Sequence, residues 1–263
     1  MLGGGTFTAQ NKVLPGSYMN FVSAANAGNL DGASGVVAIA LDLNWGPKDT
    51  LMEIGMDTLE NGLRELIGYD YTDDNAKVIR EIMRHASRVY LYRLNGNGVN
   101  ASCTFGTAKY AGTRGNDIKV VISANADDSD TFDVITCLGT EVVDRQIAVA
   151  SAAALEDNAY IVWNDSSTLA VTTGTSCQNG TNSTAAGSDH SAFLSAIECE
   201  AFNVLCSTSQ DSSVEALYAA FTRRMIEQAG VKIQTVLYNY VGDYDGIINV
   251  VDSANLVPWV SGA

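Results

Sequence analysis

The chain has 263 residues and a formal net charge of −15, because 15 basic side chains are outnumbered by 30 acidic ones. Hydrophobic residues make up 46% of the chain, enough for a folded core, which excludes an intrinsically disordered protein. The acidic balance argues against direct binding to nucleic acid and against docking on anionic lipid, and no apolar run approaches the ~20 residues that membrane insertion requires.

The first 34 residues are predicted to form an extended arm outside the core. Pro15-Gly16 predicts a turn, and residues 17–22 alternate in the manner of a strand. Residues 23–34 are small and polar and bury little surface by themselves. The arm therefore needs a partner surface, either its own core or a neighbouring molecule.

The first core element is predicted at residues 35–43, where a continuous apolar run is typical of a strand covered on both faces. A helix is predicted at 57–67, where four apolar side chains share one face. A second helix begins near Asp73 or Asp74, either of which can cap it. A strand at 89–94 follows directly.

The composition changes at about residue 95, after which Gly, Asn, Thr, Ser and Asp dominate and helical periodicity largely disappears. Six short runs separated by turn signals predict a small, mostly antiparallel β-rich unit, at 104–108, 118–124, 131–137, 141–149, 160–163 and 169–173. Residues 96–189 carry 4 basic and 11 acidic side chains, which suits an exposed outward face.

Helix and strand patterns return after this unit, with a helix at 192–199 and a buried strand at 201–206. Ser212 and Glu215 have capping-box spacing before an amphipathic helix that Gly230 ends. Strands at 231–238 and 247–251 follow. A strand, a helix and a strand in this order imply a parallel pair.

The fold class predicted from these elements is α/β, with a core of parallel strands interrupted by an inserted β-rich domain. The predicted parts are an arm of residues 1–34, a discontinuous core of 35–95 plus 190–263, and an inserted domain of 96–189.

Residues suited to catalysis or metal binding are few. The five cysteines form no CxxC pair and there are only two histidines, so reduced, buried thiols are expected in place of a disulfide scaffold or zinc site. Residues 127–130 lack the Gly and Glu of a calcium loop and read as a hairpin turn. Asp70, Asp73 and Asp74 are expected to serve helix capping.

Two further motifs contain residue types found in functional sites. Ser188-Asp189-His190 has the residue types of a hydrolase triad, but adjacent residues cannot place a nucleophile, a base and an orienting group in a row. Gly96-Asn97-Gly98 lacks the third Gly of a dinucleotide loop. We therefore expect a non-enzymatic protein without catalytic residues, cofactor or metal. The alternative is a small-molecule-binding or hydrolytic α/β enzyme with a deep pocket at residues 207–213, after a parallel strand.

Several long strings occur in an order that is more specific than any single motif: Gly3 to Phe7, Asn11 to Phe21, Leu43 to Pro47, Leu91 to Gly96, Ala108 to Ile118 and Asp243 to Val250. Together they resemble the tail sheath proteins of contractile-tailed phages and of phage-like elements of Gram-positive bacteria.

The resemblance implies a structural subunit that polymerises with other copies around a tail tube and contracts to drive the tube through the host cell envelope for genome delivery. It implies a place in the virion, assembly in the host bacterial cytoplasm, and tail tube protein and baseplate as partners of the full-length protein. Terminal arms would pair with neighbouring sheets by strand addition. The expected subunit contacts are Phe7, Tyr18, Asn20, Phe21 and Val22.

Sheath proteins of this kind usually continue beyond a segment like Pro258-Trp259-Val260 into a C-terminal domain, which we expect this chain to lack. Without that domain, the chain is expected to be mostly monomeric in dilute solution. The sheath of a bacteriocin-like or secretion particle remains an alternative to that of a phage.

Overall fold

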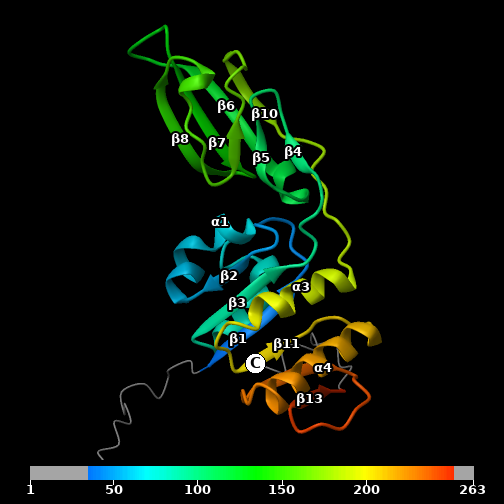
Figure 1. Cartoon of the computed structure of the whole chain (residues 1–263). Helices are drawn as coiled ribbons and strands as arrows, with labels where there is room; N and C mark the ends of the chain where they lie inside the picture. The colour runs from blue at the N-terminus through cyan, green and yellow to red at the C-terminus, as the bar shows by residue number, and fades with distance from the viewer. Residues whose placement is uncertain (1–34, 252–263) are drawn as a thin grey trace, which may run out of the picture. The chain divides into compact units, whose positions relative to one another are not determined.

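The computed structural model describes residues 35–251 (Figure 1). The predicted arm of residues 1–34 lies outside the described residues, and so does the segment from Pro258 to Val260. Within residues 35–251, no helix is long and apolar enough to cross a membrane.

A six-stranded mixed sheet forms the centre of the core, in the order β13-β12-β11-β1-β3-β2. Five neighbouring strands are parallel, and they are β13 (Ile247–Val250), β12 (Gln234–Tyr238), β11 (Val204–Cys206), β1 (Val36–Leu41) and β3 (Arg88–Arg93). The edge strand β2 (Leu51–Ile54) runs antiparallel to β3. Chain segments from both sides of the insertion therefore build one sheet, and the α/β fold class is confirmed.

Helices cover both faces of this sheet. One face packs against α1 (Leu63–Ile67), which follows a π-helical turn at Thr58–Gly62, and against α2 (Lys77–Met83). The other face packs against α3 (Gly187–Ile197) and α4 (Ser212–Glu227). Alternate β1 residues enter the two apolar clusters, with Ile39 on the first face and Ala38 on the second. Burial on both faces explains the continuous apolar run in this strand.

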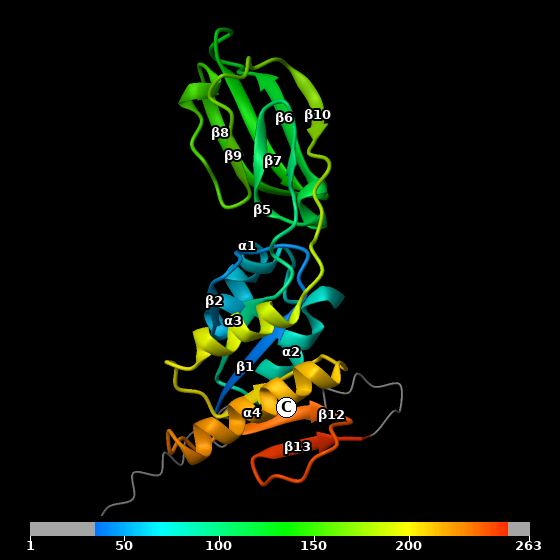
Figure 2. The same ribbon diagram turned by 45° about the vertical axis from the view of Figure 1, so that its right-hand side comes forward.

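Residues 100–176 form two smaller antiparallel sheets (Figure 2). The first has the order β10-β6-β7-β8, with β6 at Ile118–Ala124, β7 at Phe132–Leu138, β8 at Glu141–Val149 and β10 at Thr172–Ser176. The second has the order β4-β5-β9, with β4 at Asn100–Ser102, β5 at Gly106–Ala111 and β9 at Ile161–Trp163. The two sheets share one apolar cluster, as expected of a sandwich.

Several predicted elements differ from the structure. The short strands β2 and β4 were not predicted. The prediction of a capping box at Ser212 and Glu215 is wrong. Asp211 is the N-cap of α4, and its carboxylate accepts a hydrogen bond of 2.8 Å from the Ser213 N–H. Gly230 does adopt a left-handed backbone, with φ of +70°, just beyond the end of α4.

One strand and one helix begin at other residues than predicted. β12 begins at Gln234 and not at Val231, which is exposed and outside the ladder. α3 begins five residues earlier than predicted, because the Asp189 carboxylate accepts a hydrogen bond from the Ala186 N–H and stabilises its first turn.

Candidate functional site

Two polar side chains follow neighbouring parallel strands at the carboxyl edge of the core sheet. Asp42 comes directly after β1 and Ser207 directly after β11. Nearby, the Nδ1 atom of His190 lies 3.1 Å from the Tyr218 hydroxyl. Burial lowers the pKa of His190 and raises the pKa values of Asp42 and Tyr218. Burial thus favours the neutral form of all three groups.

The Ser188-Asp189-His190 string does not form a catalytic chain of hydrogen bonds. The Asp189 carboxylate accepts a 2.7 Å hydrogen bond from the Ala186 N–H, at the start of α3. The His190 ring is buried against Tyr218, with ring centroids 5.7 Å apart. The aspartate therefore serves the helix terminus, and the histidine serves the packing of α3 on α4.

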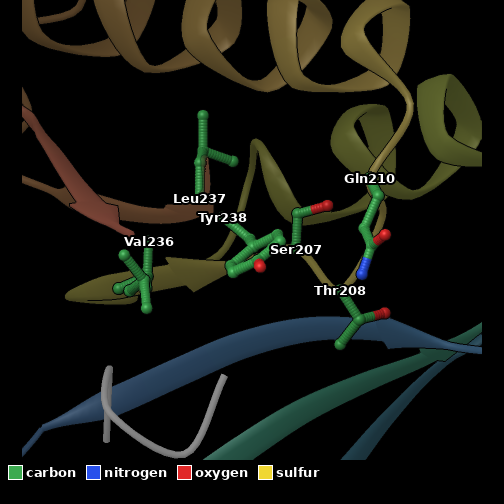
Figure 3. A pocket seen from close by; sticks show the side chains of 7 residues that line it. Ser207, Thr208, Gln210, Val236, Leu237 and Tyr238 are labelled. Carbon is green, nitrogen blue, oxygen red and sulfur yellow. The ribbon is translucent and has the colours of Figure 1, made fainter. Parts of the chain in front are cut away.

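The loop after β11 encloses a cavity of about 40 Å³ (Figure 3). Its walls come from this loop and from the ends of β12 and β13: Ser207, Thr208, Gln210, Val236, Leu237, Tyr238 and Val250. Sites that bury small organic ligands usually measure about 300–1,000 Å³. The cavity has room for only a few water molecules and is not the deep pocket that the enzyme alternative requires.

A larger hollow of about 500 Å³ lies beside this cavity, over the first turn of α4 and the loop after β12. Its lining residues are Gln210, Ser212, Glu215, Ala216, Tyr238, Asn239, Tyr240 and Val241. Burial, together with the charge of Asp211, raises the pKa of Glu215. The lining places hydroxyl groups of Ser212, Tyr238 and Tyr240 near this carboxyl group, but no histidine, cysteine, lysine or arginine.

The acidic groups identified in the sequence have structural contacts. Asp73 caps the helical turn before α2 as predicted, through a 2.8 Å hydrogen bond from the Asn75 N–H, whereas the capping role predicted for Asp70 is wrong, because its carboxylate pairs with Arg64. Residues 127–130 lie in the turn between β6 and β7. Within residues 35–251, no cluster of three or more His, Cys, Asp or Glu side chains is placed to hold a metal ion.

A buried junction joins the core to the inserted sheets, and Trp45 is its apolar centre. Trp45 follows β1 in the chain but belongs to the apolar cluster of the inserted sheets, and it is fully buried. Its ring centroid lies 5.3 Å from that of Tyr110 and 6.3 Å from that of Tyr160. Its indole N–H donates to the Glu65 carbonyl of α1 at 3.2 Å. One side chain thus contacts both regions.

Arg93, at the end of β3, is the polar centre of the same junction. Only 2% of it is exposed, and its Nη1 donates hydrogen bonds of 2.7 Å to the carbonyls of Gly46 and Ala111. Burial lowers its pKa to about 10, so it stays charged at neutral pH. Its hydrogen bonds fix the loop after β1 and the end of β5 to the core sheet.

Further hydrogen bonds close the junction around these two residues. Arg114 Nε donates to the Gly68 carbonyl at 3.0 Å, and its guanidinium lies 4.5 Å from the ring centroid of Tyr69. Asn182 donates to the Asn44 side chain at 2.7 Å. A β-carbon at Gly112 would lie 2.1 Å from the Asn44 carbonyl oxygen, so only glycine fits there.

Three of the strings that carry the family resemblance meet in this junction. Residues 43–47 supply Asn44 and Trp45, residues 91–96 supply Arg93, and residues 108–118 supply the segment from Tyr110 to Arg114. The contact between these three strings could not be predicted from the sequence. A tryptophan in a polar loop and an arginine at the end of an apolar strand were the available signals.

The structure does not test the predicted contacts of the arm. Phe7, Tyr18, Asn20, Phe21 and Val22 all lie outside the described residues.

Three family models match consecutive parts of the chain. The N-terminal region of domain III of the tail sheath protein Gp18 matches residues 34–94. The phage tail sheath protein β-sandwich domain matches residues 95–184. The phage tail sheath protein central domain matches residues 183–261.

Two curated relatives from Bacillus subtilis align with the whole chain. The uncharacterized protein YqbK is 34% identical, and the phage-like element PBSX protein XkdK is 33% identical. The chain spans 63% of the length of each.

Solved structures agree with this grouping. A sheath tail protein from Desulfitobacterium hafniense is 33% identical, with a TM-score of 0.77 over 90% of this chain and 56% of that protein. A sheath tail protein from Listeria innocua is 32% identical, with a TM-score of 0.72 over 84% of this chain and 51% of that protein. With sheath-domain matches from residue 34 to residue 261 and a shared fold, the chain belongs to the phage tail sheath protein family.

Proposed function

We propose that the protein is a structural, non-enzymatic subunit of a contractile tail sheath. Copies of it polymerise around a tail tube, and contraction of the sheath drives the tube through the host cell envelope to deliver the genome. The observation that supports this function best is the unbroken series of three sheath-domain matches over residues 34–261. The cavity enclosed by the loop after β11 is consistent with it, because about 40 Å³ is too small for a substrate.

The proposal includes the parts and partners of the subunit. Residues 1–34 form the arm, 35–95 plus 190–263 the core, and 96–189 an outward-facing domain. The arm residues Phe7, Tyr18, Asn20, Phe21 and Val22 contact a neighbouring copy. The sheath assembles in the bacterial cytoplasm around the tube protein and on a baseplate, without direct contact to nucleic acid and without membrane insertion.

The buried junction supports the mechanical part of this proposal. During contraction, a sheath subunit has to move as a rigid body while its contacts to neighbours change. Arg93 and Trp45 hold the inserted sheets to the core through buried contacts. A force applied to one region is therefore transmitted to the other.

Electron microscopy tests the function. The complete reading frame that encodes this chain is coexpressed with the tube protein of the same genetic element, and particles are imaged before and after a contraction trigger. We expect striated sheaths around tubes, in two helical states that differ in the rise per subunit. A protein that remains monomeric beside bare tubes would overturn the proposal. A variant without residues 2–34 is the control for the arm, and it should fold but fail to polymerise.

The phage-like alternative has an observation in its favour, since one relative is a phage-like element protein. Nuclease-protected DNA in the purified particles decides between the two. A particle that carries a genome is a phage, whereas an empty tail is a bacteriocin-like or secretion particle.

A further inference from the structure

Two cysteines lie opposite each other where the inserted sheets begin and end. Ser102 and Gln178 form an antiparallel bridge with reciprocal backbone hydrogen bonds of 2.9 and 3.0 Å. In the same antiparallel register, the next two residues opposite each other are Cys103 and Cys177. The backbone N–H of Cys103 bonds to the Gly106 carbonyl and that of Cys177 to the Ile118 carbonyl, so neither spans the gap between the two cysteines.

This arrangement is that of a non-hydrogen-bonded antiparallel pair. Such pairs have Cα atoms about 4.5 Å apart and side chains that project on the same face. Disulfides require Cα atoms roughly 4.4–6.8 Å apart. Both thiols are free in the structure. The register set by the Ser102–Gln178 bridge therefore places the two cysteines at a separation that a disulfide can span.

We propose that Cys103 and Cys177 are a redox modification site: they form a reversible cross-strand disulfide by exchange with a low-molecular-weight disulfide such as oxidised glutathione. The inference goes beyond the sheath role and does not depend on it.

The reaction proceeds in two balanced steps. The Cys103 thiolate attacks one sulfur of the small disulfide, which forms a mixed disulfide and releases one small thiolate. Cys177 then loses its proton and attacks the Cys103 sulfur, which forms the protein disulfide and releases the second small thiol. The two cysteines are oxidised, the small disulfide is reduced to two thiols, and no other oxidant is needed.

The surroundings assign these roles to the two cysteines. Cys103 is half-buried, whereas Cys177 is almost completely buried. The hydrogen bond from Cys177 lowers the pKa of Cys103, and the same bond together with burial raises the pKa of Cys177. Cys103 is thus the accessible thiolate that reacts first, and Cys177 is the thiol that resolves the mixed disulfide.

The disulfide would join the two inserted sheets. Cys103 follows β4 of one sheet and Cys177 follows β10 of the other. It would close a loop of the 73 residues from 104 to 176, which is nearly the whole insertion. A crosslink over so long a loop restricts the unfolded chain strongly, and the oxidised protein is therefore the more stable form.

Peptide mapping of the full chain tests the proposal. The reduced protein is equilibrated under native conditions with glutathione mixtures of rising oxidised fraction, its free thiols are alkylated, and its peptides are analysed by mass spectrometry. We expect a peptide pair linked through Cys103 and Cys177 that disappears again on reduction. Oxidation should raise the melting temperature by about 5 °C or more. A wild-type protein that stops at glutathionylated Cys103, or that reacts only at the exposed Cys199, would overturn the proposal.

Serine variants separate the two roles. Cys177→Ser should trap the mixed disulfide on Cys103, and Cys103→Ser should slow modification of Cys177 by about tenfold or more. Cys137→Ser is the matched control, because Cys137 lies in β7 opposite Lys119 and Val142 and should leave the crosslink unchanged. Equal reactivity of Cys177 with and without Cys103 would contradict the assignment. If a variant does not fold, the wild-type map still decides.

Discussion

The core sheet and the inserted sheets bury their residues in different ways. β1 of the core is buried on both faces, and its alternate residues enter two separate apolar clusters. β6 of the insertion buries one side only: Ile118, Val120 and Ile122 are buried, whereas Lys119 and Val121 are partly exposed. A strand of a three-layer core is covered on both faces, whereas a sandwich leaves one face of each sheet exposed to solvent.

Because the two regions have separate apolar clusters, the residues that contact both regions matter for their coupling. Trp45 comes from the core loop after β1 yet completes the apolar cluster of the insertion. Arg93 is a charged residue at the end of an otherwise apolar strand, and its hydrogen bonds reach the inserted segment. These two side chains couple the stability of one region to that of the other.

The largest effect is expected from Trp45→Ala. Loss of a fully buried indole leaves a cavity and should lower the free energy of unfolding by about 3–5 kcal/mol. Urea denaturation followed by circular dichroism measures this loss, and a second, earlier transition is expected as the regions uncouple. Tyr71→Ala, at a side chain with 41% exposure, is the control and should change stability little. A loss below ~1 kcal/mol at Trp45 would show that the regions are not coupled through it.

Arg93→Met should have the next largest effect. The substitution keeps much of the volume but leaves the Gly46 and Ala111 carbonyls without their donor, which should cost about 2–4 kcal/mol. The same denaturation experiment applies. Arg88→Met, at the exposed start of the same strand, removes only a surface ion pair with Glu53 and should be nearly neutral. Similar losses at both positions would contradict a special role for Arg93.

Gly112→Ala tests the close approach at the junction. Gly112 has φ of +139°, and a new β-carbon would overlap the Asn44 carbonyl oxygen. We expect a loss of about 1–3 kcal/mol, measured as a shift in the urea midpoint. Gly187→Ala is the control, because nothing lies within 4 Å of its β-carbon position and its backbone needs no positive φ. An alanine tolerated equally at both glycines would mean that the junction can relax.

The smallest effect is expected at the start of α4. Hydrogen bonds from Ser213 lower the pKa of Asp211, so the cap stabilises the fold fully above the unfolded pKa of ~3.9 and loses its contribution as the pH falls through the lower folded value. Asp211→Ala should lower the melting temperature at pH 7, and this difference should shrink as the pH falls through the lowered pKa of Asp211. Ser212→Ala should be neutral, and a larger effect at Ser212 would restore the capping box.

Much of the fold follows from local sequence patterns. The limits of β6 and β8 agree with the predicted runs at 118–124 and 141–149, because alternation and flanking turn signals define both strands. The parallel pairing of β11 with β12 followed from the helix between them. The four-residue edge strand β2 was not predicted, since a short run gains its strand structure only from its pairing with β3.

The contacts of the junction could not be predicted from local sequence patterns. Arg93 and Ala111 are 18 residues apart, and Asn44 and Asn182 are 138 residues apart, so their contact depends on the whole fold. The opposition of Cys103 and Cys177 likewise depends on strand register, which cysteine spacing does not encode. Only the resemblance to sheath proteins marked several of the junction segments in advance.

The bridge between Val99 and Thr181 has a consequence for how this protein can vary. Hydrogen-bonded bridge partners lie about 5.5 Å apart, so the chain leaves the core and returns to it at nearly one point. A tight turn could join these two positions without stretching the six-stranded sheet. Any segment that replaced residues 100–180 would also have to cover Trp45 and accept the hydrogen bond that Arg93 gives to Ala111.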